Sequence, residues 1–259
     1  MQKQEKLSLS STILKKGKEL GADLVGIASP EKTRNSPSSQ LAPHLPAIKV
    51  GLGNGTKEAG VETWPAMAKS LIVIGLSHPE DKPEMDWWYG EGSPPGNKKL
   101  IRIIKELNSW LNTRYPGIET FHPPYHVENG GIFLKDAAVW AGLGTIGKNN
   151  LLITPDFGPR IRLRSLILNI NLPPTGPVEY NPCSGCGEYC LEGCPQEAFS
   201  EIIFSQEKTG LLKLPGKIGN YSRLKCHDEM EKALENSGNG QKEICKFCRV
   251  CEFNCPVGK

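Results

Sequence analysis

The cysteines constrain this 259-residue sequence more than any other feature, because all nine lie between residues 183 and 255. They form two runs with Cys226 between them, Cys183-x2-Cys186-x3-Cys190-x3-Cys194-Pro195 and Cys245-x2-Cys248-x2-Cys251-x3-Cys255-Pro256. The second run has the spacing of bacterial ferredoxins, in which three close thiolates bind one [4Fe–4S] cluster and the fourth binds another. The first run has one extra residue in its middle gap, which we interpret as a small loop insertion. The two runs predict a redox protein with two iron–sulfur clusters, both of the [4Fe–4S] type.

The crossed spacing assigns most of the ligands. One cluster is expected to bind the thiolates of Cys183, Cys186, Cys190 and Cys255. The other is expected to bind those of Cys194, Cys248 and Cys251, together with one more. Cys245 fits this last place by its spacing, and Cys226 fits it if the ligand comes from an upstream loop; the cysteine left over would be a buried free thiol. Two zinc sites are the alternative, but tandem Cys-Pro runs favour clusters.

The composition is that of an ordinary globular protein. The net charge of +3 is too small to argue for nucleic-acid binding by itself. No apolar run reaches the roughly 20 residues of a membrane span, and the N-terminal residues lack the apolar stretch of a secretory signal. Clustered thiols in a reducing compartment bind metal more often than they form disulfides. We therefore expect a cytoplasmic protein with no membrane partner.

Helices and strands intermingle before the cysteines, which predicts an α/β domain. Strands are expected at 23–28, 70–76 and 161–170, and helices at 10–21, 97–113 and 133–142. Loops are expected at 29–66, which includes Gly51, Gly53 and Gly55, and at 77–96. The helix at 97–113 has one apolar face, formed by Leu100, Ile103, Ile104, Leu107, Trp110 and Leu111. A domain boundary is expected near residue 175, after the turn-rich segment 172–177, which gives domains 1–175 and 176–259.

Several segments together resemble a known family. The stretch Val127-Glu-Asn-Gly-Gly-Ile-Phe-Leu-Lys-Asp136 is followed by Ala141-Gly-Leu-Gly-Thr-Ile-Gly-Lys-Asn-Asn150, and then by Leu151-Leu-Ile-Thr-Pro-Asp-Phe-Gly158 and a Leu-Pro-Pro at 172–174. These residues are similar to epoxyqueuosine reductases, which are relatives of the reductive dehalogenases. The resemblance continues into both cysteine runs and covers most of the chain, with weaker echoes at 21–27 and 68–75.

The resemblance implies a fold, a cofactor and partners. It implies a nitroreductase-like α/β domain at 1–175, which would bind a corrinoid and the substrate, followed by a ferredoxin-like double-cluster domain at 176–259. A base-off cobalamin would receive single electrons from the clusters and reduce an unknown substrate, either a small molecule or a modified nucleoside. A low-potential protein such as ferredoxin or flavodoxin would donate the electrons.

The resemblance also implies site residues. Glu128 occupies the place of the family's acid above the corrin, and a carboxyl group there can serve as a general acid if its surroundings raise its pKa. Asp136 is the second candidate; its plainer interpretation is a solvated helix residue beside Lys135. A ligand loop that approaches the corrin closely would be formed by Gly142, Gly144, Gly147, Lys148 and Asn149. The alternative is an ordinary helix stop at Gly142 or Gly144.

Three departures from the family pattern matter. Thr145 stands where the family usually has an aromatic residue. Arg160, Arg162 and Arg164 alternate along a strand, so they share one face, which is either solvated or an anion site. The sequence ends four residues after Cys255, whereas the tRNA-acting enzymes typically continue, which puts a tRNA substrate in doubt. An alternative function is therefore a two-cluster electron-transfer protein that reduces or activates a partner, such as a corrinoid protein, without its own cobalamin.

Overall fold

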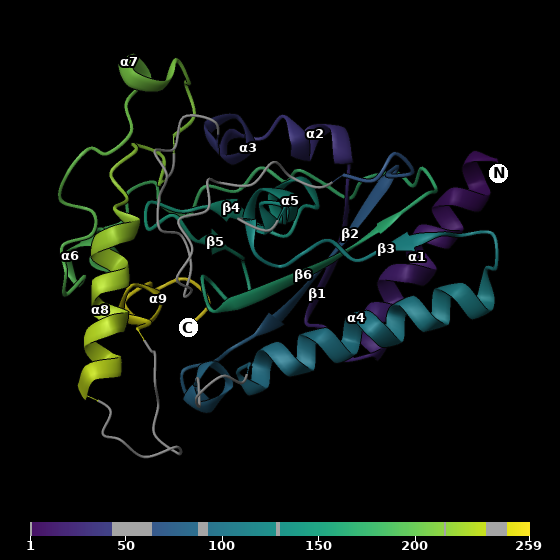
Figure 1. The fold of residues 1–259 in the computed structure, drawn as a ribbon, viewed down its shortest axis with the longest axis horizontal. Coiled ribbons are helices and arrows are strands. Elements are labelled where there is room, and N and C mark those ends of the chain that lie inside the picture. Colours follow the sequence, from purple (N-terminus) through teal and green to yellow (C-terminus); the bar gives the residue numbers. More distant parts are fainter. Residues whose placement is uncertain (1, 43–63, 88–92, 128–129, 215, 237–247) are drawn as a thin grey trace. The chain divides into compact units, whose positions relative to one another are not determined.

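The computed structural model describes residues 2–42, 64–87, 93–127, 130–214, 216–236 and 248–259 of the chain (Figure 1). The chain divides into two compact units, each built from three stretches of sequence. Unit 1 contains residues 1–76, 100–145 and 163–179, and unit 2 contains residues 77–99, 146–162 and 180–259. The last change of unit, at Glu179, lies close to the boundary expected near residue 175. The stretches 77–99 and 146–162 were expected in the first domain but belong to unit 2.

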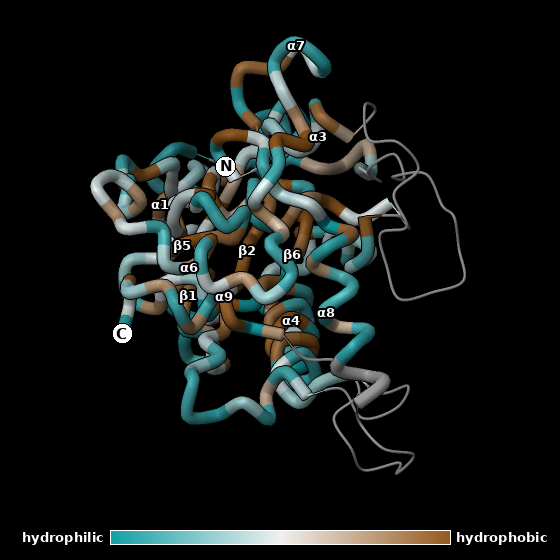
Figure 2. The backbone as a smooth tube through the Cα atoms, turned by 90° about the vertical axis from the view of Figure 1, so that its left-hand side faces the viewer, coloured by the Kyte–Doolittle hydropathy of each residue, from teal (hydrophilic) through white to brown (hydrophobic). Residues whose placement is uncertain are grey.

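A four-stranded sheet forms the centre of unit 1. Its strands are β1 (Leu24–Ala28), β2 (Ser70–Ser77), β6 (Ile161–Leu168) and β3 (Thr120–Phe121), in the order β1-β2-β6-β3. β1 pairs antiparallel with β2, and β3 pairs antiparallel with β6. Every residue of β2 except the last is buried. Its nearly continuous apolar sequence is typical of a strand that is covered on both faces. Figure 2 accordingly shows β2 and β6 as hydrophobic.

Helices cover both faces of this sheet (Figure 1). Helix α1 (Lys3–Glu19) packs on β1 at Gly17, where a Cβ would lie only 2.8 Å from Val25 Cγ2. On the next residue of the strand, a Cβ at Gly26 would collide with the carbonyl oxygen of Ala141, just after helix α5 (Leu134–Trp140). Successive strand residues point to opposite faces. Helices α1 and α5 therefore lie on opposite sides of β1.

Helix α4 (Pro95–Arg114) confirms the predicted apolar face. Its buried residues are Leu100, Ile103, Ile104, Leu107 and Leu111, while Trp110 is half-buried. The exposed side carries charged residues, among them Arg102 and Glu106, which form an ion pair 3.0 Å apart. The 3.6-residue period of the sequence therefore predicted both the helix and the side that it buries.

Three expectations about local structure were wrong. Helix α1 begins at Lys3 and not near Ser10, because the Glu5 carboxylate accepts a hydrogen bond from the Gln2 N–H and caps the start. The expected loop at 29–66 contains helices α2 (Pro30–Arg34) and α3 (Pro37–Leu41). Each begins at a Ser-Pro pair, in which serine is the N-cap and proline the first helical residue. The same pair is also common in turns, which is why the sequence suggested a loop. The expected loop at 77–96 contains the 3-10 helix η2 (Pro83–Asp86).

Unit 2 has little regular structure. Besides η2 and the first residues of α4, its described helices are α6 (Tyr189–Glu192), α7 (Gln206–Thr209), α8 (Arg223–Asn236) and α9 (Val250–Phe253), and all of these except α8 are short. A small sheet pairs β4 (Thr145–Ile146) with β5 (Leu152–Ile153), and β4 begins in unit 1. In the part of the chain that the structure describes, no helix combines the length and the apolar character needed to cross a membrane.

Candidate metal centre

One group of thiols in unit 2 combines cysteines from both runs. Burial raises the pKa of the Cys190 thiol to about 11, and the charges of Cys255, Cys183 and Cys186 act in the same direction. These four thiols therefore lie close enough to influence one another, although Cys255 is far from the others in sequence. The group has the same members as the first predicted ligand set.

A second group surrounds Cys248 and Cys251. Burial raises the pKa of the Cys248 thiol, and Cys226 and Cys194 contribute to the rise. Burial also raises the pKa of the Cys251 thiol, to which Glu252, Cys226 and Cys248 add. Cys226, which lies on helix α8, is thus the described thiol that joins Cys194, Cys248 and Cys251, and its place as the eighth ligand stays a prediction. Cys245, the other candidate for this place, lies outside the described residues.

Short helices hold the thiols of unit 2. Helix α6 carries Cys190 and helix α9 carries Cys251. The two helices are joined where Asn254 Nδ2 donates a hydrogen bond to the Tyr189 carbonyl over 3.4 Å. In the first run, the Ala198 N–H donates to Cys194 Sγ over 3.4 Å, a contact that also stabilises a thiolate.

The chemistry of the donor sets suits two iron–sulfur clusters. Each thiolate of a [4Fe–4S] cluster binds its own iron, so a cluster needs four thiols around a common space. The electrostatic influence of the thiols on one another groups the eight described cysteines into two sets of four, and none of them forms a disulfide. Among the described residues, no three His, Cys, Asp or Glu side chains gather around a position for a single metal ion. The charge of Cys190 also acts on Cys251, so the two sets are neighbours.

An ionic network lies beside the second cysteine run. Asp86 accepts from Arg162 Nε and pairs with Arg249 Nη1, both over 2.9 Å. Glu252 pairs with Arg162 Nη2 and Arg249 Nη2, both over 2.8 Å. The imidazole Nδ1 of buried His78 lies 2.9 Å from Asp86 Oδ2. Since Arg249 and Glu252 flank Cys251 in sequence, the network fixes the segment that carries this thiol.

The network changes the acidity of Asp86. Burial alone would raise the pKa of the Asp86 carboxyl. Its hydrogen bond with His78 and the positive charges of Arg162 and Arg249 outweigh this effect and hold the pKa below the ordinary value. Asp86 is therefore an ionised carboxylate that balances two guanidinium groups.

The row of arginines is not a solvated strand face, so that interpretation was wrong. Arg160 is 5% exposed and precedes β6, and Arg162 pairs with Asp86 and Glu252. Arg164 lies over the ring of Tyr125, 3.5 Å from the ring centroid. The alternation predicted that the three side chains point to one face of the strand, but it could not show which groups cover that face. For Arg162, the anions are carboxylates of the protein itself.

Of the two predicted acids, Glu128 lies outside the described residues. Asp136 is 4% exposed, so its interpretation as a solvated helix residue was wrong. Its carboxylate accepts hydrogen bonds from the Ser38 hydroxyl over 2.6 Å and from the Ser38 N–H over 3.3 Å. Asp136 therefore connects α5 to the first turn of α3. Its catalytic role stays a prediction.

The residues of the predicted ligand loop contact protein groups within their own units. Gly142 has φ +72°, and a Cβ there would lie 2.8 Å from the Thr175 carbonyl oxygen. A Cβ at Gly147 would lie 2.6 Å from the Ile153 side chain, and Gly144 is buried. Lys148 pairs with Glu188, which raises the pKa of Lys148. Asn149 accepts from the Leu151 N–H and donates to the Cys251 carbonyl. These contacts explain the residues structurally, and their role as cofactor ligands stays a prediction.

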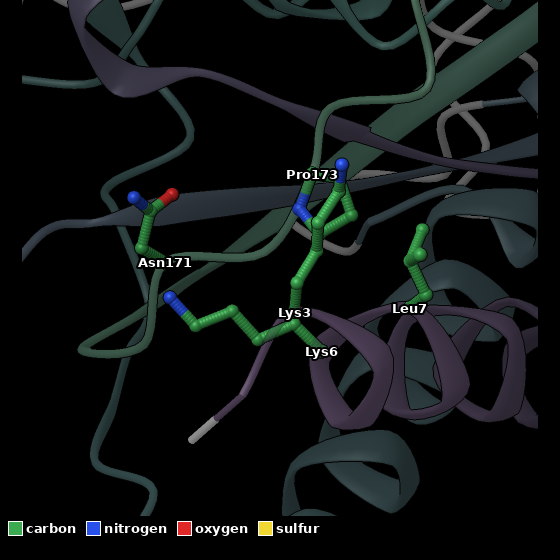
Figure 3. A pocket seen from close by; sticks show the side chains of 5 residues that line it. All are labelled: Lys3, Lys6, Leu7, Asn171 and Pro173. Carbon is green, nitrogen blue, oxygen red and sulfur yellow. The ribbon is translucent and has the colours of Figure 1, made fainter.

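Unit 1 has a separate cavity of about 300 Å³ (Figure 3). Lys3 and Lys6 extend into it from the first turns of α1, beside Leu7, Asn171 and Pro173. None of the predicted site residues lines it, so it is not part of the candidate metal centre.

In comparisons with known proteins, both the sequence and the structure of this chain are similar to epoxyqueuosine reductases. No family model matches the chain. The epoxyqueuosine reductase of Synechocystis sp. (strain ATCC 27184 / PCC 6803 / Kazusa) is 31% identical over 244 residues, which cover 89% of this chain and 79% of that protein. A crystal structure of an epoxyqueuosine reductase with an epoxyqueuosine-modified tRNA stem loop has a TM-score of 0.64 at 19% identity, over 97% of this chain and 65% of that one.

A catabolic reductive dehalogenase, NpRdhA, in complex with 3-bromo-4-hydroxybenzoic acid has the same fold, with a TM-score of 0.61 at 20% identity. The match covers 95% of this chain and 31% of the dehalogenase. The chain therefore spans slightly less than two thirds of the solved reductase and about a third of the dehalogenase. At these identities, the structural likeness shows a shared mixed α/β fold.

Proposed function

This chain belongs to the epoxyqueuosine reductase family, and from that premise we propose that it is an iron–sulfur reductase with two [4Fe–4S] clusters and a base-off cobalamin. The observation that supports the clusters is the gathering of eight cysteines into two sets of four within unit 2. The substrate is left as a small molecule or a modified nucleoside, and the electron donor as a low-potential protein such as ferredoxin or flavodoxin. Because a related structure contains an epoxyqueuosine-modified tRNA stem loop, transfer RNA is included among the substrates to be tested.

The chain's own residues would hold and insulate the clusters. When bound, the clusters supply one-electron transfer. One would be held by Cys183, Cys186, Cys190 and Cys255, and the other by Cys194, Cys226, Cys248 and Cys251. The electrostatic contact between Cys190 and Cys251 supports electron exchange between the two sets. Cys255 is buried and the other seven described cysteines are half-buried, so the protein shields these thiols in part from water.

The cobalamin part of the proposal depends on family membership. When bound base-off, cobalamin supplies a cobalt ion that single electrons can reduce. The described contacts of Gly142, Gly147, Lys148 and Asn149 are all with protein groups, and the role of these residues toward a corrin is part of the proposal. The second candidate function is an electron-transfer protein that reduces or activates a partner without its own cobalamin.

One experiment separates the two functions. The chain would be purified without oxygen, its iron and sulfide measured, and cob(II)alamin added while the cobalt signal is followed by EPR. For the reductase we expect about eight irons per chain and tight binding with a base-off spectrum. Intact clusters without cobalamin binding would support the electron-transfer protein. A chain without iron and sulfide would contradict both functions.

Glu128 is the proposed general acid, and the matched test uses two conservative variants. We expect Glu128→Gln to abolish turnover while iron content stays unchanged, because an amide cannot donate the proton. We expect Asp136→Asn to reduce the free energy of unfolding by about 1–3 kcal/mol, because the amide group then faces the Ser38 donors. Turnover would be measured with a low-potential reductant on the modified stem loop or on a halogenated aromatic, whichever the unmodified chain reduces. Full turnover in Glu128→Gln would exclude this acid.

A further inference from the structure

Arg160 is a buried cation without a carboxylate partner among the described residues. It is 5% exposed. Its guanidinium donates hydrogen bonds to three main-chain carbonyls: Nη1 to Glu252 over 3.0 Å and to Cys255 over 3.3 Å, and Nη2 to Val257 over 2.5 Å. All four residues belong to unit 2.

The neighbouring carboxylates do not neutralise Arg160. The carboxylates of Asp86 and Glu252 pair with Arg162 and Arg249 instead. Glu80 and Asp81 line a cavity that Arg160 also lines, but they are exposed and form no ion pair with it. Carbonyl oxygens satisfy the N–H groups of a guanidinium but do not cancel its charge. A buried charge is costly unless an opposite charge accompanies it, so this position calls for an anion.

The anion that the geometry offers is the first cysteine set. Arg160 contacts the carbonyl of Cys255, whose thiol completes the set of Cys183, Cys186 and Cys190. Four thiolates give a [4Fe–4S] cluster a net negative charge, which becomes larger when the cluster is reduced.

We propose that Arg160 is the counter-ion of the cluster bound by Cys183, Cys186, Cys190 and Cys255, and that its charge raises the reduction potential of this cluster. The inference rests on the proposed function, because it needs the clusters. When this cluster accepts one electron from the external low-potential donor, its charge becomes more negative by one. Arg160 stays protonated, so no proton moves, and the fixed positive charge stabilises the reduced state.

Arg162 and Arg249 are not expected to act in this way. Each is paired with Asp86 and with Glu252, so the positive charges in that network are largely offset nearby. Substitutions at Arg160 can therefore distinguish the effect of its positive charge on the cluster from its structural role. Arg160→Lys keeps the charge but loses the planar fork, and Arg160→Met removes the charge at similar length.

The test is an anaerobic potentiometric titration of the purified protein with both clusters, followed by EPR, after iron and sulfide have been measured. We expect Arg160→Met to reduce the ratio of reduced to oxidised cluster about tenfold at a fixed potential, which is a shift of 59 mV for one electron. Arg160→Lys should titrate close to the unmodified chain. The signal of the other cluster should move less, because Cys255 is the one described cysteine to which Arg160 donates a hydrogen bond.

Two results would overturn the inference while leaving the proposed function intact. One is an unchanged titration in Arg160→Met with full iron content. The other is an equal shift in the Lys and Met variants, which would indicate a structural effect. If Arg160→Met does not retain iron, Arg160→Gln replaces it in the same comparison, because its amide still donates to carbonyls. An unmodified chain without clusters would instead contradict the proposed function itself.

Discussion

Replacing Cys226 with alanine is expected to remove about half of the iron and sulfide from the anaerobically purified chain. Cys226 interacts with Cys248 and with Cys251, and the Cys248 thiol also interacts with Cys194. Without its fourth thiolate this cluster should be lost or degrade to a form with fewer irons. Iron and sulfide per chain would be measured chemically, and the remaining cluster would be observed by EPR.

Cys245→Ala is the matched control for Cys226→Ala. Both substitutions remove one thiol from the same part of the sequence, and only one of the two cysteines is needed to complete eight ligands. We expect Cys245→Ala to retain all of its iron. The opposite pattern, with iron lost in Cys245→Ala and kept in Cys226→Ala, would assign the eighth place to Cys245.

Replacing Asp86 with asparagine is expected to reduce the free energy of unfolding by about 3–5 kcal/mol, because Arg162 and Arg249 are left with too little negative charge. The Asp86 side chain is only 13% exposed, so water cannot replace the lost charge. Denaturant unfolding at neutral pH without oxygen would measure the change. Glu106→Gln breaks the exposed pair with Arg102 and should cost no more than about 1 kcal/mol. Equal effects in the two variants would contradict the role of the buried network.

The stabilisation that the Asp86 carboxylate provides is expected to depend on pH. The pKa of Asp86 is lower in the folded chain than its ordinary value. The stabilisation is therefore complete above the unfolded pKa, which is about 3.9, and is lost as the pH falls through the lower folded pKa. The difference in unfolding midpoint between the unmodified chain and Asp86→Asn should shrink over this range. A constant difference across this range would contradict the prediction.

The parts that could be predicted from the sequence are those that a short stretch of chain determines. The apolar face of α4 follows from its period, and the buried run of β2 from its composition. The grouping of Cys183, Cys186 and Cys190 with Cys255 was expected from the spacing, because the fourth cysteine of each run serves the other cluster. Helices α2 and α3 were missed because one turn of helix after Ser-Pro has no period to detect.

The charged network could not be predicted, because its members share no motif. Only the fold brings His78 and Asp86 to Arg249 and Glu252, which are more than 150 residues further along the chain. The alternation of Arg162 with its neighbours indicated a direction, but the identity of what lies opposite depends on long-range packing. Predicting these contacts requires the fold first.

The three-part construction of unit 2 has a consequence for how the protein is made. A chain that leaves the ribosome N-terminus first exposes Cys183, Cys186 and Cys190 before Cys255 has been synthesised. Asp86 and Arg162 can pair with each other, but the complete network must likewise wait for Arg249 and Glu252. Contacts between distant parts of a chain form slowly, since the intervening loop must close first. In the proposed ligand sets, iron delivery to the first set therefore follows the synthesis of Cys255, and the open thiols of the nascent chain need protection from oxidants until it occurs.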